Sequence, residues 1–96
     1  MPLGNETIAT KNGASEKFAI LYPNPTSDHY NIKLSGIEDG VSVSADVINL
    51  FGQRMEHYEW KHHAIPKMVR SNLPQGVYFI KIMVEGKIQI LKLDKI

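Results

Sequence analysis

Histidines are the first candidates for chemistry in this sequence, because imidazole binds metal ions and transfers protons near neutral pH. His62 and His63 are adjacent, so in a strand they face opposite sides and do not bind one metal together, unless this segment is a loop near His57 or His29. The chain contains no cysteine, which excludes a disulfide, a thiolate zinc site and a cysteine nucleophile. We therefore expect no metal and no cofactor.

Other reactive residue types fit a structural role better. Glu38-Asp39 precedes a glycine and is typical of a solvated turn, although paired carboxylates in a loop could hold calcium weakly. Nucleophilic catalysis needs a serine or threonine beside a base with an oriented third group, and no Gly-x-Ser-x-Gly elbow or comparable arrangement is present. Phe51, Tyr58 and Trp60 could form a sugar-stacking platform, but aromatic side chains in a small β domain more often fill its core. The sequence does not predict an enzyme.

Length and composition limit the number of domains and the kinds of partner that this chain can have. The chain has 96 residues, which support one compact domain, and its 43% apolar and 22% charged residues are ordinary for a globular protein. Eleven Lys and Arg against ten Asp and Glu are scattered along the chain, so no basic field attracts nucleic acid. The longest apolar runs, such as 77–80, are far shorter than the roughly 20 residues of a membrane-spanning helix. We expect neither nucleic acid as a partner nor a membrane span.

The opening residues differ from the rest. Residues 1–17 are rich in small polar side chains, and they lack the cationic start and apolar stretch of a secretory signal. This composition is typical of a flexible linker between domains. We expect residues 1–17 to be a linker, or the remnant of a cut from a longer chain, and residues 18–96 to form one domain.

From Phe18 onward, apolar residues alternate with polar ones and turn formers separate the runs, which is the pattern of β-strands. The alternation changes phase at Ile48, which predicts a bulge or burial on both faces. Gly52 supplies the positive φ of a tight hairpin loop, and Glu85-Gly86 closes a second hairpin. The runs are 18–21, 30–34, 41–50, 54–60, a weaker 65–69, 77–84 and 87–93. About seven short strands predict an all-β fold, an antiparallel β-sandwich.

Two proline-containing segments are expected to restrict the backbone conformation. In residues 21–26, two prolines remove backbone donors and force extended dihedrals on the residues before them, which makes a rigid corner. In residues 73–78, Gly76 is expected to supply a special dihedral or a close approach after Pro74. Tyr78 faces the same way as the apolar residues that follow it, with its hydroxyl seeking a partner at the rim.

These segments also carry a family resemblance. A Tyr-Pro-Asn-Pro opening, a middle strand that ends in an apolar-Gly turn, a Leu-Pro-x-Gly-x-Tyr step and a final lysine-bearing strand follow one another here as they do in the type IX secretion C-terminal sorting domain. Residues 18–96 resemble that family as an ordered set. The residues that carry the resemblance are Tyr22, Pro23, Asn24, Pro25, Gly52, Leu73, Pro74, Gly76, Tyr78, Lys87, Lys92 and Lys95.

The resemblance implies an immunoglobulin-like β-sandwich at the C-terminus of a larger exported protein. Such a domain passes through the periplasm, is read by the type IX translocon in the outer membrane, and is then usually removed by a sortase-like peptidase as the cargo reaches the cell surface or the medium. The activity belongs to the N-terminal cargo domain. Lys87, Lys92 and Lys95 are either edge charges that discourage aggregation or, with the final hairpin, part of a surface read by strand addition.

One alternative belongs to another class of function. A permanent accessory module that binds carbohydrate or protein would have the same fold, because fold alone does not fix function. A sorting domain is expected in the precursor and missing from the mature surface protein, whereas a binding module persists and retains a ligand. In either case an unpaired edge strand would permit a strand-swapped dimer.

Overall fold

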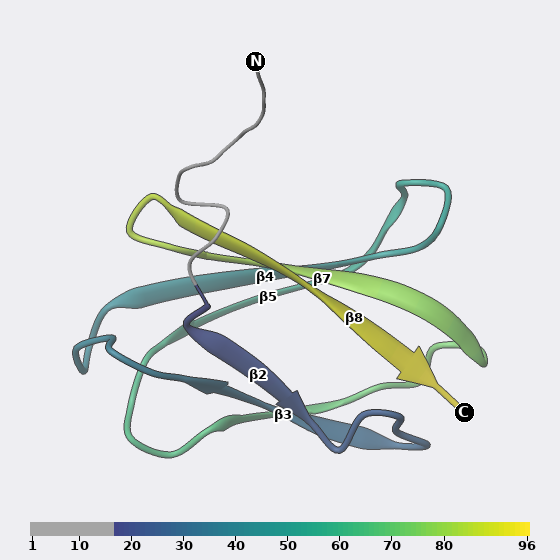
Figure 1. Ribbon diagram of the computed structural model, residues 1–96, viewed down its shortest axis with the longest axis horizontal. Helices are drawn as coiled ribbons and strands as arrows, with labels where there is room; N and C mark the ends of the chain where they lie inside the picture. Colours follow the sequence, from purple (N-terminus) through teal and green to yellow (C-terminus); the bar gives the residue numbers. More distant parts are fainter. Residues whose placement is uncertain (1–16) are drawn as a thin grey trace.

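The computed structural model describes residues 17–96 as two antiparallel sheets facing each other (Figure 1). One sheet has three strands in the order β2-β3-β6, and the other has four in the order β5-β4-β7-β8. The strands are β2 (Ala19–Tyr22), β3 (His29–Leu34), β4 (Ser42–Ile48), β5 (Arg54–Lys61), β6 (Lys67–Arg70), β7 (Gly76–Val84) and β8 (Lys87–Lys95). The predicted linker, apart from Lys17, lies outside the described residues. Residues 17–96 contain no helix that is long and apolar enough to cross a membrane.

The two inner faces form one core, because each central strand turns every second side chain inward. Tyr30 and Ile32 of β3 belong to the same core as Ile80 and Ile82 of β7, and all four are almost completely buried. The buried core consists of Phe18, Ala19, Tyr30, Ile32, Leu34, Val43, Ala45, Val47, Val69, Tyr78, Ile80, Ile82, Val84 and Leu93. The prediction of an all-β sandwich of about seven strands is confirmed.

The strand order is that of immunoglobulin-like sandwiches. β2, β3 and β6 take the places of strands A, B and E, while β4, β7 and β8 take those of C, F and G. β5 extends the second sheet beyond β4, so β5 and β8 are its edges. The weak run predicted at 65–69 is β6, which pairs with β3 rather than with its neighbour in sequence.

A bulge, one of the two features predicted near Ile48, is present. Val47 pairs with Glu56, but Ile48 pairs with Arg54, which leaves Met55 as the extra residue on β5. The run predicted to reach residue 50 therefore ends at Ile48, because residues 49–53 form the hairpin loop.

Antiparallel pairing gathers four separate segments at one end of the sandwich. Gly76 pairs with Lys95, Thr26 bridges to Lys95, and the starts of β3 and β5 lie at this same end. In Figure 1 these segments lie on the right, with the C-terminus, and the other turns lie on the left. We call this the motif end, which consists of residues 22–28, 49–53, 71–75 and 94–96.

The core alternation gives a matched pair of substitutions. Ile80 is 0% exposed and its neighbour Ile90 on β8 is 61% exposed, on the opposite face of the same sheet. Ile80→Ala should lower the free energy of unfolding by about 2–5 kcal/mol, because it leaves a cavity between the sheets. Ile90→Ala should change it by less than about 0.5 kcal/mol. Urea unfolding measures both, and equal effects would contradict the inward and outward assignment.

Candidate functional site

Asn24 joins the opening of the domain to its last strand. Its Nδ2 donates to the carbonyl of Lys92 at 2.7 Å, and its Oδ1 accepts from the amide of Asp94 at 2.9 Å. A side-chain amide therefore makes the donor and acceptor contacts that a neighbouring strand would make with the outer edge of β8. Pro23 and Pro25 flank this residue, and the peptide bonds that precede them are both cis.

Thr26 extends this contact to the end of the chain. Its amide donates to the carbonyl of Asp94 at 2.9 Å, and its carbonyl accepts from the amide of Ile96 at 2.8 Å. These bonds form a parallel bridge between Thr26 and Lys95, while the Thr26 hydroxyl donates to the carbonyl of His29. We call the contact of residues 24–26 with residues 92–96 the seam. The Tyr-Pro-Asn-Pro segment forms a corner after β2, and it also covers the outer edge of the last part of β8.

Gln89 ties the other half of β8 to the opposite sheet. Its Oε1 accepts from the amides of Phe18 and Ala19 at 2.8 and 2.9 Å, and its Nε2 donates to the carbonyl of Ala19 at 3.1 Å. Gln89 is not among the residues predicted from the sequence to be important. A signal was present, since Gln89 interrupts the inward-facing series that Leu91 and Leu93 continue.

The second motif closes a loop. The hydroxyl of the buried Tyr78 donates to the carbonyl of Pro74 at 2.7 Å, and the partly buried Leu73 packs against the core. Gly76 has φ +158°, and Tyr78 lies over it, with Cε2 3.8 Å from where a Cβ would stand. A tyrosine near the start of strand F that bonds to the backbone a few residues upstream is the tyrosine corner of immunoglobulin-like domains. The prediction for Gly76 was a special dihedral or a close approach, and for Tyr78 a hydroxyl partner at the rim; the Pro74 carbonyl itself was not predicted.

Gly52 also has the predicted conformation. It lies in the β4–β5 loop with φ +82°, and its amide donates to the carbonyl of Asn49 at 3.1 Å. A side chain at this φ would be strained, so the glycine permits a tight loop.

The three lysines of the final strand do not form one patch. Lys92 and Lys95 lie near the motif end, whereas Lys87 follows the turn at the opposite end. Lys92 faces outward from the sheet and has its ammonium 3.9 Å from Asp94. A single charged stripe along β8 is therefore not formed.

His57 makes side-chain hydrogen bonds at both of its ring nitrogens. On the outer face of the four-stranded sheet, its Nδ1 is 2.5 Å from Asp46 and its Nε2 is 2.7 Å from Glu59. These hydrogen bonds, first to Asp46 and then to Glu59, raise the pKa of His57 above its usual value. Because carboxylates occupy both ring nitrogens, neither nitrogen is open to a serine. The spacing of His57 and Glu59 on one strand face was the signal that the sequence analysis did not use.

The metal alternatives do not assemble within the part of the chain that the structure describes. No three His, Asp or Glu side chains there converge as metal ligands. Asp46 and Glu59 bind opposite sides of the His57 ring, so they do not converge on one point. His62 and His63 follow the end of β5, and the backbone of His62 pairs with Gly40 and Val41.

The aromatic residues lie in different places. Tyr58 and Trp60 face inward from β5 and pack against the core, whereas Phe51 lies in the β4–β5 loop. Burial, followed by the hydrogen bond to Glu56, raises the pKa of Tyr58 to about 12. Burial also raises the pKa of Tyr30, with smaller effects of Tyr58 and Glu56. The ammonium of Lys67 lies 5.9 Å from the Trp60 ring. Phe51, Tyr58 and Trp60 therefore do not form a sugar-stacking platform.

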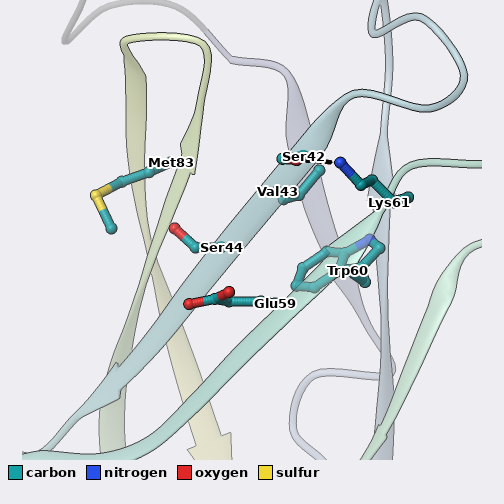
Figure 2. A pocket seen from close by; sticks show the side chains of 7 residues that line it. All are labelled: Ser42, Val43, Ser44, Glu59, Trp60, Lys61 and Met83. Atoms are coloured by element: carbon teal, nitrogen blue, oxygen red, sulfur yellow. Dashed lines mark hydrogen bonds between the residues drawn. The ribbon is translucent and has the colours of Figure 1, made fainter.

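A shallow concavity of about 450 Å³ lies on β5, β4 and β7, and Figure 2 shows the side chains that line it. Lys61 lies at one side of it and donates from Nζ to the hydroxyl of Ser42 at 2.7 Å. Its lining is Ser42, Val43, Ser44, Glu59, Trp60, Lys61 and Met83. The concavity lies on the sheet face, apart from the loops of the motif end, and none of the residues in the family resemblance lines it.

Fold and geometry together define a class of protein. It is a small immunoglobulin-like sandwich whose distinctive residues hold loops and strand edges in place at one end. The chain belongs to the family of secretion system C-terminal sorting domains, whose family model matches residues 20–94. We found no match among curated proteins. Membership makes this a type IX secretion signal that directs a cargo protein across the outer membrane, generally to the cell surface or the medium.

The seam predicts a local effect of one amide. Asn24→Ala removes both bonds to β8, so we expect the free energy of unfolding to fall by about 1 kcal/mol and the amide of Asp94 to lose hydrogen-exchange protection. Asn31→Ala is a suitable control, because its side chain makes a single bond of 3.3 Å within the other sheet. Unchanged exchange at Asp94 would contradict the role given to Asn24.

His57 predicts a pH dependence of stability. The pKa of His57 is raised in the folded state. Its contribution to the free energy of unfolding is therefore complete below the unfolded pKa of about 6.5, and it is lost as the pH rises through the folded pKa. Stability should therefore decline above about pH 6.5. His57→Gln should flatten this decline, and His63→Gln, at an exposed position, should not. Urea midpoints measured across this pH range test the sign.

Proposed function

We propose that the motif end is the surface by which the type IX translocon recognises this domain and exports the cargo attached on its N-terminal side. The observation that carries the proposal is the convergence of residues that lie far apart in sequence. Residues 22–26, 73–78 and 92–95 meet at one end of the sandwich, and Gly52 lies at the same end, in the loop between β4 and β5. Hydrogen bonds to β8 and within the second motif fix these segments, so the end presents a defined shape.

We also propose that the domain catalyses no reaction itself. Among residues 17–96, His57 has both nitrogens engaged by carboxylates, and Ser42 accepts from an exposed lysine. Neither His57 nor Ser42 therefore belongs to a pair of nucleophile and free base, which covalent catalysis by a serine requires. Under this proposal the activity of the exported protein resides in its cargo.

Removal of the domain after export is a further part of the proposal. A sortase-like peptidase needs an extended chain at its cleavage point, and residues from Phe18 onward are held in the sandwich. The amides of Phe18 and Ala19 are both bonded to Gln89. We therefore place the cut before Phe18, so that the whole sandwich leaves as one unit.

Export of a reporter tests the proposal. Residues 1–96 are fused behind a signal peptide and a fluorescent protein, in a bacterium with type IX machinery and in a matched strain without it. We expect fluorescence at the surface or in the medium only in the first strain, and an exported reporter that has lost the mass of the sandwich.

Two outcomes would tell against it. Periplasmic retention in both strains would contradict recognition by the translocon and would favour the permanent accessory module that binds carbohydrate or protein. An exported reporter that keeps its full mass would contradict removal by a peptidase while leaving recognition intact.

A further inference from the structure

The loop between β4 and β5 exposes two large apolar side chains at the motif end. Leu50 is 65% exposed and Phe51 is 88% exposed, and Met55 beside them on β5 is 42% exposed. Single exposed apolar residues are common on protein surfaces, but a contiguous group at a loop tip usually marks a contact with another molecule. Neither the fold nor the core requires these side chains.

The loop is held in one conformation. Asn49 accepts at Oδ1 from the amides of Phe51 and Gln53 at 2.9 and 3.0 Å, and it donates from Nδ2 to the side chain of Gln53 at 2.8 Å. The backbone adds two bonds, from the Asn49 amide to Gln53 and from the Gly52 amide to Asn49. Aromatic residues on a rigid support lose little conformational entropy on binding, which is the property of an anchor residue.

The charges around this loop indicate which kind of surface Leu50 and Phe51 contact. Residues 47–53 carry no charged side chain, and the nearest cation, Arg54, has its guanidinium 3.5 Å from Asp46. A loop that inserts into a bilayer gains from lysine or arginine at its base, because these side chains contact lipid phosphates. The one cation at the base of this loop, Arg54, is paired with Asp46, so the uncharged tip fits an apolar cleft in a protein better than the phosphate layer of a bilayer.

We infer that Leu50 and Phe51 form an apolar anchor that inserts into an uncharged, apolar cleft of the type IX translocon. The inference deepens the proposed function and rests on it. A buried phenyl ring covers about 150–250 Å² of surface, so the cleft must be deep enough for one ring and one branched aliphatic side chain. Bound in this way, the anchor would fix the sandwich by its motif end, with the other end free.

The reporter fusion of residues 1–96 tests the inference with matched variants. The double variant Leu50→Ser and Phe51→Ser should lower export by about tenfold or more, because loss of an aromatic anchor removes much of the affinity. Phe51→Met, which keeps an apolar side chain, should retain most of it. Ile65→Ser is the control, because Ile65 is 81% exposed at the opposite end of the sandwich. Equal urea midpoints for the purified domains would show that folding is unchanged.

The outcomes separate the two levels of the argument. If the unaltered fusion is exported only with the machinery, and the double variant is exported equally well, the inference is wrong and the proposed function stands. If the unaltered fusion is never exported, both fall.

A photoreactive phenylalanine at position 51 identifies the occupant. A crosslink to an outer-membrane component of the machinery, without a crosslink from position 65, would support the inference. A crosslink from position 51 to lipid or to a second copy of the chain would overturn it, as would flotation of the domain with phosphatidylethanolamine and phosphatidylglycerol vesicles that depends on Phe51.

Discussion

The seam between residues 24–26 and the last strand is the contact on which the form of this domain depends. The chain has no cysteine, so no disulfide joins its two sheets. They are held by their common core and by the hydrogen bonds of Asn24, Thr26 and Gln89 to β8 and β2. These bonds also occupy backbone groups at the outer edge of β8 that would otherwise pair with another chain.

Closure of that edge explains why the first and last motifs lie together. Asn24 takes a place beside β8, and Gly76 lies across from Lys95 on the other side of the same strand. The segments around residues 24, 76 and 95 are therefore consecutive in space although they span most of the sequence. A surface composed in this way exists only when the whole sandwich has folded. Recognition at this end would consequently select the folded domain and not an extended peptide.

Local patterns predicted most of the fold and little of the assembly. Alternation placed the strands, the phase change at Ile48 predicted a bulge or burial on both faces where the pairing of β4 and β5 in fact shifts, and Gly52 has its expected φ. Alternation does not reveal which strands pair, so the contact of β6 with β3 could not be foreseen. Nor does it distinguish a buried aromatic residue from an exposed one, since Trp60 packs inward and Phe51 points to solvent. Those differences arise from tertiary contacts, which one strand does not contain.

The roles of the motif residues follow from the same division between local and tertiary effects. Tyr78 finds its acceptor four residues upstream, so its partner was within reach of sequence reasoning. The partners of Asn24 are 68 and 70 residues away in the sequence. The prolines on both sides of Asn24 indicate a turn, and a turn does not predict that its central side chain bonds to a distant strand. A sequence motif that predicts a turn can therefore have as its main structural effect the hydrogen bonds that it makes to the edge of another strand. In this domain, that strand is also the last one, which links the closing of the fold to the surface that we propose the translocon reads.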